Sequence, residues 1–151
     1  MRFDIKSIRK TTHNKGAGII RMFLGIMFVM TGMMKFVVPS LSNAFAGQLH
    51  AANIPFQAFN MITVPLVETV LGVVLAIGLM SRIGALVSIV LMAVATYVHL
   101  VVDDPTLFPL QPEHPIIPII VIVFSFYLLV VGGGAWSWDS RGRQMSSSTQ
   151  T

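Results

Sequence analysis

Residues 62–102 read ITVPLVETVLGVVLAIGLMSRIGALVSIVLMAVATYVHLVV and hold two long apolar runs, 62–80 and 83–102, on either side of a short turn. Each run has about 20 residues, which as a helix is long enough to cross the hydrocarbon core of a bilayer. Backbone N–H and C=O groups cannot stay unpaired in hydrocarbon, so both runs are predicted to be helices. This stretch therefore predicts a helical hairpin inside a membrane.

Two more apolar runs, 17–38 and 116–133, flank this hairpin, and the second is only just long enough to span a bilayer. Of the 151 residues, 54% are hydrophobic and 11% are charged, and mean hydropathy is +0.78. Soluble domains have about 25% charged residues, and a soluble chain this short could not cover so much apolar surface. We therefore predict an all-α integral membrane four-helix bundle, and we exclude a soluble enzyme and a disordered chain. The run 17–38 is longer than the core of a cleaved signal peptide, so we expect it to remain as a span.

Basic residues divide unevenly between the two sides of this bundle. With four spans, both termini and the 81–82 turn share one side, which collects every lysine and arginine except Lys35. Cytoplasmic segments of membrane proteins carry the excess of basic residues. We therefore predict that both termini are cytoplasmic, in a prokaryotic inner (plasma) membrane. The chain then divides into a basic tail at 1–16, a transmembrane domain at 17–140 and a flexible polar tail at 141–151.

The segment 39–61 joins the first two runs on the opposite, outer side. Leu41, Ala44, Phe45 and Leu49 recur in it at helical spacing. This pattern predicts a short interfacial helix that lies on the outer leaflet. An amphipathic lid packed over the end of the bundle fits the same pattern, and the sequence leaves both interpretations open.

Two charged side chains fall within the predicted spans on the outer side. A charge at membrane depth is costly, so each one is a functional candidate by default. As many residues separate Arg21 from Lys35 as separate Glu68 from Arg82. In antiparallel helices, this spacing brings Lys35 level with Glu68 and predicts a buried ion pair between them. The pair has three interpretations: a clamp between helices, a proton or quinone site, or a contact with a partner subunit.

His99 is the third candidate, near the outer end of its run and one helical turn before Asp103. Its imidazole could bond a quinone oxygen or relay a proton to Glu68. The alternative is an interfacial histidine bonded to Asp103 or to water. We expect no metal site, because haem needs a second intramembrane histidine and no helical spacing unites His99 with His50 and His114. The chain also has no cysteine.

Arg21 and Arg82 stand at the predicted cytoplasmic ends of their runs. Long basic side chains at helix ends extend to the interface and hold the helix there, so we predict that both are cytoplasmic anchors. Gly25 and Gly32 lie one heptad apart on one face of the first run. Small residues at this spacing allow a neighbouring helix to approach closely.

Five fragments of the sequence, in this order and spacing, resemble the DoxX family of small membrane proteins. They are RMFLG at 21–25, TGMMKF at 31–36, PLVE at 65–68, GLMSR at 78–82 and GGGAWSWD at 132–139. The resemblance implies a four-helix membrane bundle with Arg21, Lys35, Glu68 and Arg82 as its polar motif residues. Trp138 departs from the pattern, since the family often has leucine there.

Relatives of this family include the small membrane subunit of an archaeal thiosulfate:quinone oxidoreductase. The resemblance therefore implies a small integral membrane subunit of a quinone-linked oxidoreductase complex. The polar residues found at membrane depth, Glu68, Lys35 and His99, are its candidate quinone or proton site. We expect quinone and lipid as ligands, no covalently bound cofactor and no nucleic acid, and a larger membrane protein complex as partner. No complete catalytic set is present, so we do not expect catalysis by this chain alone. The alternatives are a non-catalytic accessory subunit and a small transporter of protons or a hydrophobic solute.

Overall fold

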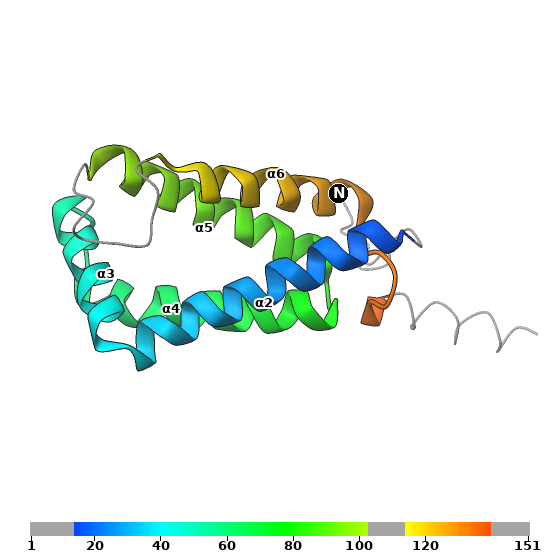
Figure 1. The fold of residues 1–151 in the computed structure, drawn as a ribbon, viewed down its shortest axis with the longest axis horizontal. Helices are drawn as coiled ribbons and strands as arrows, with labels where there is room; N and C mark the ends of the chain where they lie inside the picture. The colour runs from blue at the N-terminus through cyan, green and yellow to red at the C-terminus, as the bar shows by residue number, and fades with distance from the viewer. Residues whose placement is uncertain (1–13, 103–113, 140–151) are drawn as a thin grey trace, which may run out of the picture.

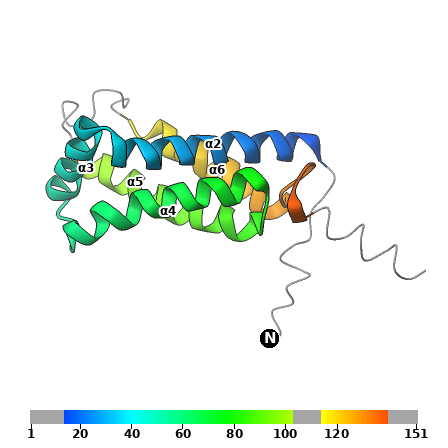
Figure 2. The same cartoon turned by 90° about the horizontal axis from the view of Figure 1, so that it is seen from below.

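A computed structural model describes residues 14–102 and 114–139, and these form helices with no strand among them. Figure 1 shows long helices that run side by side along the long axis, with the shorter α3 lying across one end. Figure 2, turned by 90°, shows the same end occupied by α3 and shows α2 alongside α4. The helices are α2 (Lys15–Val37), α3 (Pro39–Ala51), α4 (Gln57–Ile77), α5 (Ser81–Val101) and α6 (Ile116–Val131).

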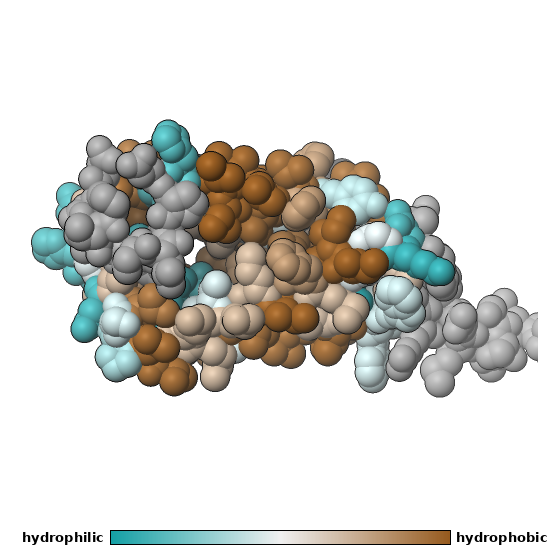
Figure 3. All heavy atoms as spheres, in the orientation of Figure 1, coloured by the Kyte–Doolittle hydropathy of each residue, from teal (hydrophilic) through white to brown (hydrophobic). Residues whose placement is uncertain are grey.

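The length and composition of the helices identify a helical membrane protein. Within the described residues, α2, α4 and α5 are long and apolar enough to cross a membrane. The fourth apolar helix, α6, has 16 residues and a length of about 24 Å, somewhat short of a hydrocarbon core of about 30 Å. Figure 3 shows apolar side chains over the middle of the visible face and hydrophilic ones toward its two ends.

Two helices end earlier than hydropathy predicts, and in both the cause is a glycine with positive φ. The second apolar run was expected to continue to residue 80, but α4 ends at Ile77 because Gly78 has a φ of 73° and its N–H donates to Val74 O and Leu75 O. The fourth run was expected to reach residue 133, but Gly132 ends α6 with a φ of 89°. Apolar residues continue past both turns, so hydropathy alone overestimates these helices.

The predicted helix in the segment 39–61 is confirmed as α3. It packs against α2, α4 and α5, and its Leu49 is buried. This packing agrees with the lid interpretation. A position at the membrane interface stays a prediction.

The bundle consists of two closely packed helix pairs, α2 with α4 and α5 with α6. Gly25 and Gly72 bring the first pair into backbone contact: a Cβ at Gly25 would lie 2.6 Å from Ala76 N, and one at Gly72 would lie 2.7 Å from Gly25 O. The close approach that Gly25 predicts is therefore confirmed, with α4 as the neighbour. A buried hydrogen bond of 2.8 Å between Ser88 and Ser125 joins the second pair. Contacts between the two pairs are fewer.

Candidate functional site

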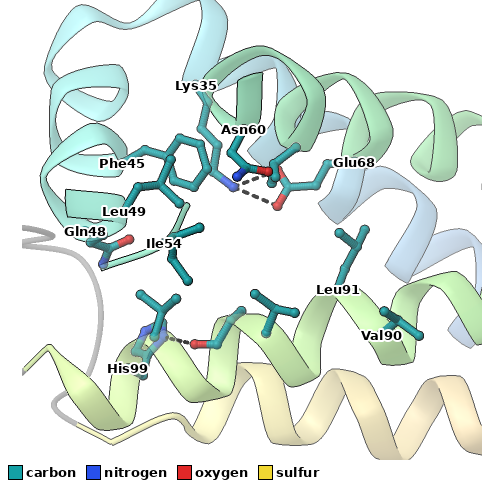
Figure 4. Close-up of a pocket in the computed structure, with 14 residues that line it drawn as sticks. Lys35, Phe45, Gln48, Leu49, Ile54, Asn60, Glu68, Val90, Leu91 and His99 are labelled. Atoms are coloured by element: carbon teal, nitrogen blue, oxygen red, sulfur yellow. Dashed lines mark hydrogen bonds and ion pairs between the residues drawn. The ribbon is translucent and has the colours of Figure 1, made fainter. Parts of the chain in front are cut away.

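A cavity of about 300 Å³ lies at the α3 end of the bundle, with walls from α2, α3, α4 and α5. Most of its lining is apolar. Lys35, Glu68 and His99, the three candidate residues chosen from the sequence, all line it. Figure 4 shows Lys35 and Glu68 on one wall and His99 on the wall opposite. The fold thus brings together three polar groups from three different helices around one apolar space.

Lys35 and Glu68 form the predicted ion pair. Lys35 Nζ lies 2.7 Å from both Oε1 and Oε2 of Glu68, and the two side chains are 15% and 6% exposed. The antiparallel glycine contact between α2 and α4 places the two positions level. Lys35 Nζ also lies 4.8 Å from the centroid of the Phe45 ring, a cation–π contact. The lysine therefore joins α2, α4 and α3.

His99 uses one ring nitrogen within its own helix. Its Nδ1 lies 2.8 Å from Ala95 O. A carbonyl oxygen can only accept a hydrogen bond, so Nδ1 carries a proton. In the neutral form of an imidazole protonated at Nδ1, Nε2 is an acceptor. Asp103, the partner predicted as the alternative, lies outside the described residues.

Other residues of the cavity were not predicted from the sequence. Asn60 of α4 and Gln48 of α3 add polar groups to the lining. Val90 and Val94 also line it while 58% and 51% exposed at the molecular surface. In the sequence, a valine of α5 that lines the cavity cannot be distinguished from one that contacts only lipid. No local pattern therefore identifies Val90 and Val94 as cavity residues. Phe45 was placed on the apolar face of its helix, but its contact with the lysine was not predicted.

Arg21 corrects one prediction. Instead of extending to the interface it is fully buried, and its guanidinium donates four hydrogen bonds to backbone carbonyls. Nε donates to Gly133 O at 2.8 Å, Nη1 to Ala76 O at 2.7 Å and to Leu75 O, and Nη2 to Trp136 O at 3.4 Å. The cause is the closing segment (residues 132–139), which folds back over the end of α4. This places a cation at the carboxyl end of α4, where the helix dipole favours positive charge.

Asp139, the last residue of the closing segment, acts at the start of the next helix. Its carboxylate accepts from Met80 N at 3.2 Å, Ser81 N at 3.1 Å and Ser81 Oγ at 3.4 Å. An anion bonded to free N–H groups is the usual N-terminal cap, and here it comes from a distant segment. Arg82 Nη2 donates to Val130 O at 3.0 Å and remains partly exposed. At this end of the bundle, hydrogen bonds of Arg21 and Asp139 therefore hold the closing segment against α4 and α5. The role of Arg82 as a cytoplasmic anchor stays a prediction.

The histidines considered for a metal site do not meet at the cavity. His50 and His114 are exposed, and only His99 lines the cavity. In the part of the chain that the structure describes, no three His, Cys, Asp or Glu side chains are placed to hold a metal ion. Asp103 and Glu113, the two carboxylates that could join these histidines around a metal ion, lie outside that part.

Comparison with protein families matches the DoxX model to residues 16–100. This range runs from the start of α2 almost to the end of α5 and includes Arg21, Lys35, Glu68 and His99. Comparisons with curated proteins and with solved structures give no match. The family model covers more than half of the chain and holds both the buried ion pair and the cavity. The chain belongs to the DoxX family.

Proposed function

We propose that this chain is a small integral membrane subunit of a quinone-linked oxidoreductase complex, and that the cavity beside Lys35, Glu68 and His99 is its quinone site. One observation carries the proposal: these three polar groups line a single, mostly apolar cavity. A volume of about 300 Å³ is at the lower end of the range for ligand pockets. It suits one substituted ring, with any long tail left outside.

The cavity offers such a ligand a path from the bilayer. Val90 and Val94 belong both to the cavity wall and to the exposed apolar surface of α5. A ligand dissolved in lipid can therefore enter sideways between α4 and α5, where helix contacts are sparse. Electrons would come from a partner subunit, since we assign this chain no electron carrier of its own.

The proposed topology has four spans, both termini in the cytoplasm of a prokaryotic cell, and the cavity in the outer half of the inner membrane. It rests on the distribution of lysine and arginine and on α6 running alongside α5 (Figure 1). Single cysteines test it, because the natural chain has none. Gln57→Cys, at the start of α4, should react with an impermeant maleimide on intact spheroplasts. Lys15→Cys, at the start of α2, should react only after lysis, and the reverse pattern would invert the topology.

Filling the cavity tests the quinone site. Val98 is buried and lines the cavity, so Val98→Phe places a ring in the space proposed for the ligand. We expect this variant to bind decylubiquinone at least tenfold more weakly than wild type in nanodiscs, measured with tritiated ligand and empty nanodiscs subtracted. Its melting temperature should not fall, because the ring enters an existing space.

Val101→Phe is the matched control, since Val101 lies on the same helix, is half exposed and does not line the cavity. We expect this variant to bind decylubiquinone as wild type does. Equal binding by wild type and Val98→Phe would exclude the cavity as the quinone site. A stable complex with an oxidoreductase partner and no quinone at the cavity would instead favour the accessory subunit, in which the ion pair serves as a clamp.

A further inference from the structure

We infer that the cavity prefers the reduced, hydroxyl-bearing hydroquinone to the quinone, an inference that rests on the proposed function. The reason is the hydrogen-bonding capacity left at its polar wall. A quinone presents two carbonyl oxygens and needs donors, whereas a hydroquinone presents two O–H groups and needs acceptors.

The obvious donor of the cavity is already engaged. A lysine ammonium has three N–H donors. Lys35 directs two of them to Oε1 and Oε2 of Glu68, each at 2.7 Å. The Phe45 ring, with its centroid 4.8 Å from Nζ, adds a cation–π contact to the same ammonium. A quinone carbonyl would therefore have to compete for Lys35 with a charged carboxylate and an aromatic ring.

The acceptors, in contrast, retain capacity. A carboxylate has about four lone-pair positions on its two oxygens, and Lys35 uses one on each oxygen of Glu68. His99 donates from Nδ1 to Ala95 O, which leaves Nε2 as an acceptor. Asn60 uses one of its two Nδ2 hydrogens on Pro55 O at 2.8 Å, so its amide keeps one neutral donor and its Oδ1 acceptor.

The two principal acceptors, Glu68 and His99, lie on opposite walls of the cavity (Figure 4). A ring with a hydroxyl group meets an acceptor on either side. A ring with a carbonyl in the same place brings its oxygen toward the negative carboxylate of Glu68. Hydrogen bonds to a charged acceptor in a partly buried site are among the stronger ones in proteins. We expect the hydroquinone to bind at least tenfold more tightly than the quinone.

Two pairs of probes measure this preference on the full chain in nanodiscs. The first pair is decylubiquinol, kept reduced under argon, and decylubiquinone. The second is 4-nonylphenol and its methyl ether, in which a methyl group replaces the hydrogen of the O–H donor, and neither needs to change its oxidation state in the assay. Affinities are measured for wild type, Val98→Phe and Val101→Phe, and only binding lost in Val98→Phe is assigned to the cavity. We expect the hydroxyl-bearing member of each pair to bind at least tenfold more tightly.

The outcomes separate this inference from the proposed function. Equal affinities within either pair, or tighter binding of the quinone or the ether, overturn the preference, while quinone binding at the cavity still upholds the proposed site. Binding of the phenol over its ether without binding of either ubiquinone form supports the acceptor-lined wall and rejects the quinone function. No cavity binding of any probe rejects both. His99→Leu removes one acceptor in a variant that keeps the ion pair, and it should reduce the phenol-to-ether ratio at least threefold.

Discussion

Arg21→Met is expected to lower the free energy of unfolding by about 3 kcal/mol or more. The guanidinium is fully buried and holds carbonyls of two separate parts of the chain: Leu75 and Ala76 at the end of α4, and Gly133 and Trp136 in the closing segment. Methionine fills a similar volume but donates no hydrogen bond. The carbonyls of Ala76 and Gly133 then lose a buried donor, and α4 loses the positive charge at its carboxyl end.

Thermal unfolding in mild detergent, followed by circular dichroism, measures this loss, which should lower the melting temperature by about 10 °C. Arg21→Lys keeps the charge but replaces a planar fork of donors with a single ammonium, so it should recover only a minor part of the stability. Arg82→Met is the control, since Arg82 is partly exposed, and it should cost much less. If Arg21→Met melts at the same temperature as wild type, the closing segment stays packed on α4 without the guanidinium.

Regular helix geometry explains which parts of this structure the sequence could predict. The Lys35–Glu68 pair follows from equal spacing along two antiparallel helices, because a helix rises by a constant amount per residue. Gly25 likewise predicted a close helix contact, since its missing side chain is a property of the residue itself. The α3 helix followed from the period of its apolar residues. In each case the local pattern already held the needed geometry.

The burial of Arg21 could not be predicted in this way. Its burial depends on the closing segment, which is more than a hundred residues distant in the sequence. That segment turns back with positive φ at Gly132, Gly134 and Trp136. From sequence alone, an arginine near a helix end is interpreted as an interfacial anchor. Only the packing of the closing segment over the end of α4 shows that Arg21 is buried. The cavity posed a similar difficulty, because Val90 and Val94 carry the same apolar signal whether they meet lipid or line a space. Long-range packing, absent from any local window, decides both.

Replacing both members of the ion pair is expected to harm the fold less than replacing either one. Lys35→Met leaves Glu68 as an unpaired charge on a side chain that is 6% exposed. Glu68→Leu leaves Lys35 as an unpaired charge on a side chain that is 15% exposed. Each single change should lower the free energy of unfolding by about 3–5 kcal/mol. The double variant leaves no charge at these two positions, and packed apolar side chains often replace a buried pair at little net cost. We expect its unfolding to return close to wild type.

A double-mutant cycle on unfolding in detergent measures this coupling, and additive losses in the double variant would argue against a mutually compensating pair. Ligand binding to the same double variant then separates the clamp from the site. If the ion pair only joins the helices, Met and Leu can take over that role, and the double variant should bind decylubiquinol as wild type does. A site loses the carboxylate that accepts the ligand hydroxyl, and binding should fall at least tenfold although the fold is restored. We expect the second result, because Glu68 keeps acceptor capacity on the cavity wall after Lys35 has used its share.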